Sequence, residues 1–275
     1  MSHTSAAAGV AEAKAGEPLL AIRDLVVAIG GATLLHVDAL DVPRGQIVGL
    51  VGESGAGKSL LQSTILGILP RHAVVGGSVR FDGQEIVGAS DRTMRGIRGR
   101  RIAVVLQAAR AALTPTLRAE TWIDRALALH DVPGPERVAR LAHALEAVRL
   151  DRALLRRYPH QLSGGEAQRV SIALAVALRV DLILADEATS ALDVTVQAEV
   201  AELFRELRQH EGTSFLLVSH DLALVAGLAD QISIIAEGRI LEQGGPEVLR
   251  HPSDPVTSAL VAATPALPSA RRELP

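Results

Sequence analysis

The chain has 275 residues, of which 48% are hydrophobic and 21% are charged, and its formal net charge is −3. These proportions are typical of an ordinary globular protein and exclude a disordered or collagen-like chain. The sequence contains no cysteine, which excludes disulfides, cysteine-ligated zinc and thiolate-held iron–sulfur clusters. The near-neutral charge and the few aromatic residues (one Trp, one Tyr and three Phe) argue against a nucleic-acid partner.

No stretch of about 18 to 20 consecutive apolar residues is present, so the sequence predicts no membrane-spanning helix. Residues 1–18 are rich in Ala, Gly and Ser and lack a basic segment followed by an apolar one, so no secretion signal is expected. We expect flexible tails at residues 1–18 and 261–275, and a protein that stays in the cytoplasm.

The first half of the chain predicts strands around one glycine-rich loop. Strands are expected at residues 19–25 and 46–51, and a helix is expected at 60–69. A short hairpin is expected at 76–86, followed by an apolar strand at 101–107.

The second half alternates helical and strand patterns, which indicates an α/β protein with a mainly parallel sheet. Helical periodicity predicts a helical subdomain at about residues 108–162. The segment after His251, rich in Pro and Ala, is expected to be loosely ordered. The remaining elements are expected in this order: a helix that opens at 163–165, a strand at 182–185, a helix at 195–210, and strands at 214–218 and 231–237.

Residues 52–59 match the phosphate-binding pattern G-x-x-x-x-G-K-[ST] between a predicted strand and a predicted helix. In this pattern backbone amides surround phosphate oxygens, the lysine reaches the β and γ phosphates, and the last hydroxyl ligates Mg²⁺. Only two of the 28 basic residues are lysines, and one of them stands at the required position. The alternative is a glycine-rich turn with a solvated lysine. The candidate phosphate-binding residues are Gly52, Glu53, Ser54, Gly55, Ala56, Gly57, Lys58 and Ser59.

Two acids, Asp186 and Glu187, directly follow the predicted strand at 182–185. Such acids lie at the carboxyl edge of a sheet, where ligands bind in open α/β folds. We expect Asp186 to hold Mg²⁺ and Glu187 to polarise the water that attacks the γ phosphate. On their own the two acids could equally cap a helix, so this interpretation depends on the upstream phosphate-binding loop.

A third motif, residues 162–166 with the sequence LSGGE, completes a combination that resembles the ATP-binding cassette subunits of ABC transporters. The resemblance covers residues 19–260 and implies a P-loop NTPase cassette, with a mainly parallel sheet core, an antiparallel β subdomain and a helical subdomain. In this family the signature faces the γ phosphate held by a partner cassette. The residues implied to do so are Leu162, Ser163, Gly164, Gly165 and Glu166, of which Glu166 replaces the more common glutamine.

Further family elements follow in the expected order. Gln107 is similar to the Q-loop glutamine, which contacts Mg²⁺ or the attacking water and links to the membrane subunit. Residues 191–193, which end in Asp193, resemble the D-loop, and His220 resembles the switch histidine that binds the γ phosphate. By ungapped alignment from Lys58, Ile29 stands where the family stacks an aromatic ring on adenine, so weaker or less selective base binding is expected.

Residues 189–198 and 238–244, with His251-Pro252, resemble the oligopeptide, dipeptide and nickel importer branch of the family. The absence of cysteine argues against the peptide importers that carry an iron–sulfur centre, and residues 65–70 with Arg110 are closer to the nickel-type D subunit. Ala108 and Ala109 depart from this branch directly after the Q-loop glutamine, so the details of its contact with the membrane subunit stay open.

The resemblance implies an ATPase that uses ATP and Mg²⁺ to energise an importer of nickel, metal chelates or peptides. The implied partners are two transmembrane permease subunits, a second cassette subunit and, indirectly, an extracytoplasmic substrate-binding protein. This branch commonly pairs two different cassettes, and the sequence leaves open whether the second cassette is a copy of this chain or a different one. The implied location is peripheral, at the cytoplasmic face of the membrane. The alternatives are a soluble ABC ATPase without a transport role and an exporter cassette.

Overall fold

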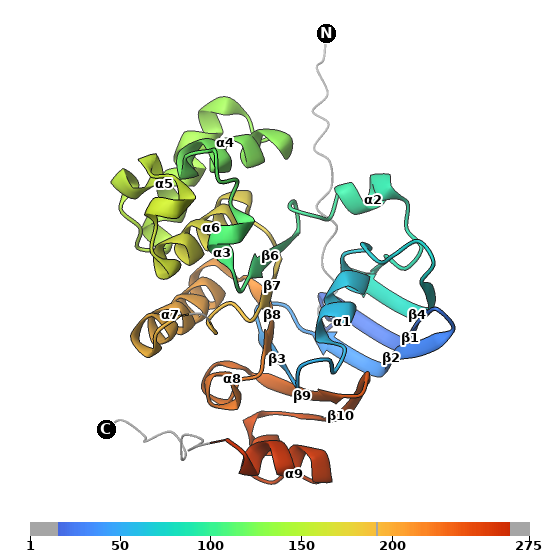
Figure 1. The fold of residues 1–275 in the computed structure, drawn as a ribbon. Coiled ribbons are helices and arrows are strands. Elements are labelled where there is room, and N and C mark those ends of the chain that lie inside the picture. The colour runs from blue at the N-terminus through green and yellow to red at the C-terminus, as the bar shows by residue number, and fades with distance from the viewer. Residues whose placement is uncertain (1–15, 191, 265–275) are drawn as a thin grey trace.

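The computed structural model describes residues 16–190 and 192–264, which form a ten-stranded sheet with helices packed around it (Figure 1). Residues 1–15 and 265–275 of the two predicted tails, and Ala191, lie outside the described residues. The strands are β1 (Leu20–Ile29), β2 (Ala32–Val42), β3 (Ile47–Val51), β4 (Val74–Phe81), β5 (Gln84–Glu85), β6 (Ile102–Leu106), β7 (Leu182–Asp186), β8 (Ser214–Ser219), β9 (Gln231–Ala236) and β10 (Arg239–Gly244). The α-helices are α1 (Lys58–Ile65), α2 (Asp91–Arg95), α3 (Ala109–Ala112), α4 (Ala119–Leu129), α5 (Gly134–Ala147), α6 (Gly164–Leu178), α7 (Val194–Glu211), α8 (Leu222–Leu228) and α9 (Pro255–Ala262), and the 3₁₀ helices are η1 (Arg152–Arg156), η2 (Pro159–Gln161) and η3 (Pro246–Leu249).

The sheet has two parts, in the strand order β5-β4-β1-β2-β10-β9-β3-β8-β7-β6. Strands β9, β3, β8, β7 and β6 run parallel to one another, whereas β1 pairs antiparallel with both β2 and β4. Every residue of β3 and β8 is buried, as expected for central strands with helices on both faces. The predicted α/β fold, with a mainly parallel core and an antiparallel β part, is confirmed.

Side chains that alternate along β8 enter two different hydrophobic clusters. Phe215 and Leu217 join the cluster that contains α6, α7 and the helical lobe, and Phe215 packs against Phe204 of α7 at 4.9 Å between ring centroids. Leu216 and Val218 point to the other face and join the cluster that contains α1 and the antiparallel strands. Because successive side chains of a strand point to opposite faces, β8 contributes to the hydrophobic core on both faces of the sheet.

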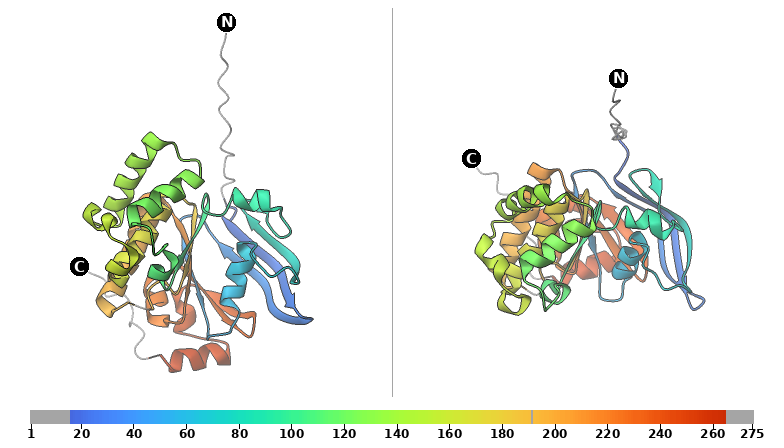
Figure 2. Two further views of the ribbon diagram at one scale, coloured as in Figure 1. Left: turned by 45° about the horizontal axis from the view of Figure 1, so that its top comes forward. Right: turned by 90° about the horizontal axis from the view of Figure 1, so that it is seen from above.

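The helical lobe, formed by α3 to α6, lies beside the β6 edge of the sheet, at the opposite end from the antiparallel strands (Figures 1 and 2). Helices α3, α4 and α5 each pack on α6, which links the lobe to the core. None of the helices described in residues 16–190 and 192–264 combines the length and apolarity needed to cross a bilayer.

The structure differs from the sequence-based expectations at several element ends. The helix predicted at 60–69 ends at Ile65 because Gly67 adopts a φ of +60°, and the N–H of Ile68 bonds back to the carbonyl of Ser63 at 3.0 Å. Strand β10 and the short helix α2 were not expected.

The expectation of loose order after His251 is wrong for residues 255–262, which form α9. Pro255 occupies the first turn of this helix, and the Asp254 side chain accepts from the N–H of Val256 at 2.8 Å. A cap followed by proline is a local helix-start signal that outweighs the composition of the segment.

Candidate functional site

A cavity of about 600 Å³ opens at the carboxyl edge of the parallel strands, between the loop after β3 and the ends of β6 and β7. Parallel strands bring their carboxyl ends to one edge of a sheet, which is why segments far apart in the sequence meet here. The cavity is lined by Leu34, Ser54, Gly55, Gly57, Lys58, Ser59, Leu60, Gln107, Asp186 and Glu187.

The loop between β3 and α1 depends on glycine at both of its ends. A Cβ atom at Gly52 would lie 2.0 Å from the carbonyl oxygen of Ile235, so no larger residue fits there. Gly57 has a φ of +105° and precedes the first residue of α1, where it cannot cap the helix with a side chain. The first amides of α1 therefore remain available at the cavity, and such amides attract anions such as phosphate.

The Lys58 ammonium lies inside this loop. Its Nζ donates to the carbonyl oxygen of Gly52 at 2.6 Å and to that of Glu53 at 2.9 Å. Burial lowers the pKa of Lys58, while the nearby charges of Glu187 and Asp186 oppose this shift. The cation is thus held where a phosphate bound by the loop would contact it.

The Asp186 carboxylate ends β7 and faces α1. Burial raises the pKa of Asp186, the neighbouring Glu187 adds to the rise, and Lys58 opposes it. In the amide orientation that satisfies both groups, Gln62 Nε2 lies 3.3 Å from each carboxylate oxygen of Asp186. Gln62 is only 5% exposed, and its position one helical turn after Lys58 puts both residues on the same face of α1. Gln62 was not predicted from the sequence, because its contact with Asp186 depends on how α1 packs against β7.

Glu187 contacts His220, which follows β8. The distance from Glu187 Oε1 to His220 Nδ1 is 3.1 Å. Glu187 has a φ of +46°, a left-handed conformation that residues other than glycine rarely adopt, and its N–H donates to the carbonyl of Val218 at 2.9 Å. Unusual backbone conformations of this kind concentrate at functional sites, because the surrounding structure must hold them in place.

Leu34 and Leu60 are the leucines that line the cavity, whereas Ile29 does not line it. Ile29 ends β1 and pairs with Ala32 across the turn to β2. Leu34 lies in β2 and is 46% exposed. The ungapped alignment pointed to Ile29 because it counts only positions along the chain. It contains no information on which strand of the β1–β2 hairpin faces the phosphate-binding loop.

The signature residues 162–166 do not line this cavity. Ser163 Oγ accepts from the Glu166 N–H at 3.2 Å, and the Ser163 N–H donates to Glu166 Oε2 at 2.7 Å. This reciprocal pair caps the N-terminus of α6 and leaves the Ser163 hydroxyl hydrogen free to donate. Replacement of the usual glutamine by Glu166 therefore preserves the cap.

The segment after Glu187 lies against the signature. A Cβ atom at Gly164 would lie 3.3 Å from Cδ2 of Leu192, and one at Gly165 would lie 2.6 Å from Cγ1 of Val196. Asp193 caps α7 by accepting from the Val196 N–H at 3.0 Å and does not line the cavity. The candidate D-loop and the signature therefore form one surface, away from the chain's own phosphate-binding loop.

The residues expected to hold Mg²⁺ supply oxygen ligands from three segments. Ser59, Gln107 and Asp186 all line the cavity. Within the part of the chain that the structure describes, no cluster of three or more His, Cys, Asp or Glu side chains could hold a metal. A few oxygen ligands suit Mg²⁺, which usually keeps several waters and binds substrate phosphates.

Comparison with known proteins identifies related sequences. A family described as "ABC transporter" matches residues 35–190. The chain is 41% identical, over 90% of its length, to the peptidoglycan transport ATP-binding protein YejF of Agrobacterium fabrum, and it spans 47% of that protein. It is 37% identical, over 82% of its length, to the oligopeptide transport ATP-binding protein OppD of Lactococcus lactis, and it spans 68% of that protein.

Solved structures with the same fold are also found. The cbiO1 protein of Clostridium perfringens, part of the transporter complex cbiONQ, has a TM-score of 0.77 at 24% identity, covering 86% of this chain and 92% of that one. The dimeric bacterial ABC transporter cassette MJ0796 has a TM-score of 0.71 at 26% identity, covering 82% of this chain and 98% of that one. The same cassette is also known as a dimer bound to ADP and Pi, described as a post-hydrolysis state.

Proposed function

Because the chain belongs to the ABC transporter family of ATP-binding proteins, we propose that it binds and hydrolyses ATP as the energising subunit of an importer. The observation that carries this proposal is the single cavity that holds Lys58, Ser59, Gln107, Asp186 and Glu187. These side chains combine phosphate binding, oxygen ligands and a carboxylate, which are the groups that this chain contributes to phosphoryl transfer to water.

Different residues of the cavity have different roles in this proposal. The loop amides and Lys58 hold the phosphates, and Ser59, Gln107 and Asp186 hold Mg²⁺, which when bound neutralises charge on the phosphate oxygens. Glu187 orients the attacking water and accepts its proton. His220 contacts the Glu187 carboxylate at 3.1 Å and, with ATP bound, would hydrogen-bond the γ phosphate, although it is not among the residues that line the cavity.

A second cassette completes the site. The signature residues lie outside the chain's own cavity, so they serve a nucleotide only when another cassette presents one. The free Ser163 hydroxyl and the glycine amides at the start of α6 suit this role. The partner is a different cassette subunit, as is common in the importer branch that the sequence resembles.

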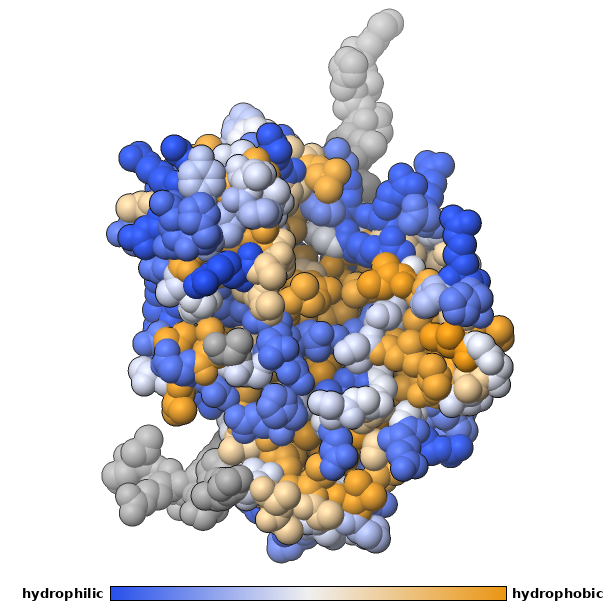
Figure 3. Space-filling view, in the orientation of Figure 1, coloured by the Kyte–Doolittle hydropathy of each residue, from blue (hydrophilic) through white to orange (hydrophobic). Residues whose placement is uncertain are grey.

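A groove of about 330 Å³ suits a segment of a transmembrane permease. It lies between β6 and the helical lobe, and its apolar lining includes Leu66, Ile68, Leu106 and Trp122. Ile68 is 57% exposed there, although a large apolar side chain normally gains from burial. Hydrophobic residues are visible in the hollow between the helical lobe and α2 in Figure 3. Because the groove also approaches Gln107 through β6, a permease bound in it would act on the cavity, and the protein would lie at the cytoplasmic face of the membrane.

Peptides are the cargo class that the relatives favour, because YejF and OppD carry peptidoglycan and oligopeptide transport in their names. The nickel-type preference from residues 65–70 and Arg110 stays a prediction. The cassette does not touch the cargo, so the ligand of the associated extracytoplasmic binding protein would decide between a peptide and a metal chelate.

One experiment tests the activity and the partnership together. The tagged full-length chain is purified from detergent-solubilised membranes, and co-purifying proteins and ATP hydrolysis are measured for the wild type and for Lys58→Ala. We expect two permeases and a second cassette to co-purify with both forms. Hydrolysis should be much slower with Lys58→Ala, since only the partner cassette then keeps an intact phosphate-binding loop. Hydrolysis without permeases would favour a soluble ABC ATPase, and equal hydrolysis by both forms would contradict the assigned site.

A further inference from the structure

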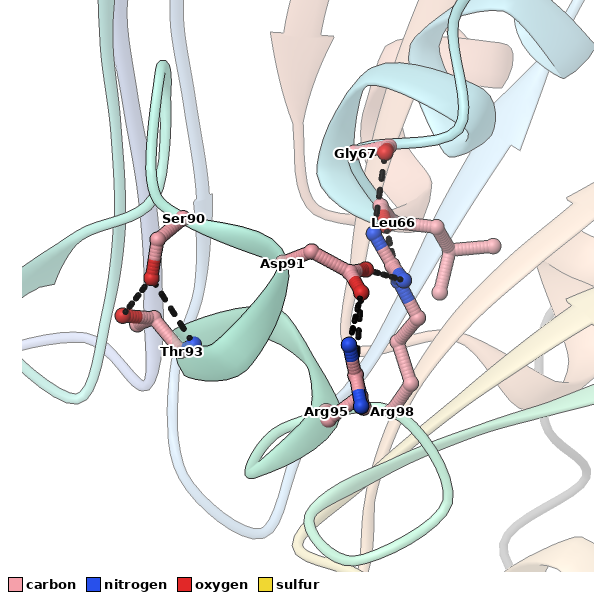
Figure 4. Close-up of polar contacts among 7 residues, drawn as sticks. All are labelled: Leu66, Gly67, Ser90, Asp91, Thr93, Arg95 and Arg98. Carbon is pink, nitrogen blue, oxygen red and sulfur yellow. Dashed lines mark hydrogen bonds and ion pairs between the residues drawn. The ribbon is translucent and has the colours of Figure 1, made fainter.

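One arginine holds the C-terminal end of α1 (Figure 4). Arg98 Nε donates to the carbonyl oxygen of Leu66 at 2.6 Å, and Nη2 donates to that of Gly67 at 2.9 Å. Both carbonyls follow the last helical residue, Ile65, and have no partner within the helix. The planar guanidinium therefore caps this end with two parallel bonds, which a lysine cannot reproduce.

An acid shared by two arginines holds Arg98 in this orientation. Asp91 Oδ1 accepts from Arg98 Nη1 at 3.1 Å, and Asp91 Oδ2 accepts from Arg95 Nε at 2.9 Å. The hydrogen bonds from Arg95 and Arg98 lower the pKa of Asp91, so this carboxylate stays charged near neutral pH. Among the described residues, Arg95 forms its hydrogen bond with Asp91 and none with α1, and its side chain is 76% exposed, against 29% for Arg98. The two arginines thus share a partner and differ in their contact with the helix.

The opposite end of α1 begins at Lys58, in the phosphate-binding loop. The helix has eight residues and so spans about 12 Å, which makes it a short rigid link between its two ends. A cation at the C-terminus and an anion at the N-terminus both fit the helix dipole. Arg98 and Leu66 also line the groove between β6 and the helical lobe, so a segment bound in that groove would contact the capped end.

We infer that Arg98 is a positioning residue that fixes α1, and through it the phosphate-binding loop, relative to the groove. This inference rests on the proposed ATP-binding function. Loss of the cap loosens the helix and misplaces the loop amides and Lys58, whereas Glu187 and His220, which follow other strands, keep their positions.

The experiment compares the wild type with Arg98→Ala, Arg98→Lys and the matched control Arg95→Ala, all as full-length chains. The Kd for ADP, the KM and kcat for ATP, and the thermal midpoint are measured for each. For Arg98→Ala we expect the Kd and KM to rise about two- to fivefold with a smaller change in kcat, the size expected for a charge at a helix end. The Kd and KM of Arg98→Lys should lie between those of Arg98→Ala and the wild type, because a lysine keeps the positive charge but cannot make the two parallel hydrogen bonds of the guanidinium. Arg95→Ala should match the wild type.

Three results would overturn the inference. A lower thermal midpoint with unchanged Kd and KM would reduce Arg98 to a structural role, and an equal effect of Arg95→Ala would make the charge alone responsible. If Arg98→Ala fails to fold, a wild-type Kd in Arg98→Lys would also overturn it. Failure of the wild type to bind ADP would overturn the proposed function as well, so the two failures are distinguishable.

Discussion

The Glu187 carboxylate and the His220 imidazole lie 3.1 Å apart, although they belong to different strands and are separated by 33 positions in the sequence. Both residues follow parallel strands, β7 and β8, which pair along the whole of β7. The left-handed backbone of Glu187 is part of the same arrangement. His220 therefore contacts the residue that is proposed to activate water. Single substitutions of His220 and of Glu187 can test the role of each residue.

We expect His220→Ala to lower kcat about 100-fold, because Glu187 loses the partner that orients it. The Kd for ADP should be unchanged, since His220 is not among the residues that line the cavity. Steady-state hydrolysis and calorimetric binding of ADP measure the two quantities. His210→Ala, on the exposed end of α7, is the control. A kcat of His220→Ala equal to that of the wild type and of His210→Ala would show that the contact has no catalytic role.

Replacement of Gln62 tests the support of Asp186. Gln62→Leu keeps most of the side-chain volume and removes the amide that faces both carboxylate oxygens at 3.3 Å. The Mg²⁺ concentration for half-maximal ADP binding should rise about tenfold, as for other groups that orient a metal ligand. A titration of ADP binding with MgCl₂ measures this, with Ser63→Ala on the same helix as control. An unchanged Mg²⁺ requirement would show that the amide has no such role.

Leu34→Ala should weaken ATP binding about fivefold, because the side chain is half-exposed and burial of part of a leucine contributes about 1 kcal/mol. The Kd values for ATP and GTP are measured for this variant, for Ile29→Tyr and for Val138→Ala, an exposed apolar control on α5. If only Leu34→Ala changes the Kd values for ATP and GTP, Leu34 is the side chain that packs on the nucleotide base. A gain of ATP affinity in Ile29→Tyr alone would instead restore the assignment made from the alignment.

Asp82 joins the antiparallel part of the sheet to the parallel core. Its Oδ2 accepts from Arg101 Nη2 at 2.8 Å, Oδ1 accepts from Arg44, and Arg101 Nε donates to Asp181 at 2.7 Å. Burial favours the neutral acid, yet the hydrogen bonds from Arg101 and Arg44 lower the pKa of Asp82 below its usual value. A lowered pKa in the folded state means that this stabilisation is present above the pKa of the unfolded chain and is lost as the pH falls through the folded value.

Asp82→Asn should therefore reduce the free energy of unfolding at pH 7 by about 1 kcal/mol, the upper range for partly exposed pairs. The difference from the wild type should shrink below about pH 4, where the Asp82 carboxylate of the unfolded wild-type chain becomes protonated, and it should vanish below the lower pKa of the folded chain. Thermal unfolding between pH 3 and pH 7 measures this. If the stability difference between the wild type and Asp82→Asn grew as the pH fell, the proposed stabilisation by the charged Asp82 carboxylate would be contradicted.

Local sequence patterns were sufficient for the parallel core and for the segments of the cavity. The residues 52–59, Gln107 and Asp186 each stand at the end of a predicted parallel strand, and parallel strands end at one edge. Leu34 and Gln62 were missed because their roles depend on how β2 and α1 pack against other segments, which no local pattern records. The contact of Arg98 with Leu66 joins positions 32 apart and was equally invisible. By contrast, the end of α1 at Gly67 and the start of α9 at Asp254 carried local cap signals that could have been used.

The central claim, that this cavity hydrolyses ATP with Glu187 as the group that activates water, is tested most directly by Glu187→Gln. The substitution keeps the shape of the side chain and removes its ability to accept a proton. ATP hydrolysis and the Kd for ATP are measured on the wild type and the variant, together with their dimer formation in ATP. The account predicts that hydrolysis is abolished, ATP binding is retained and the dimer is stabilised. Turnover by Glu187→Gln at the wild-type rate would contradict it.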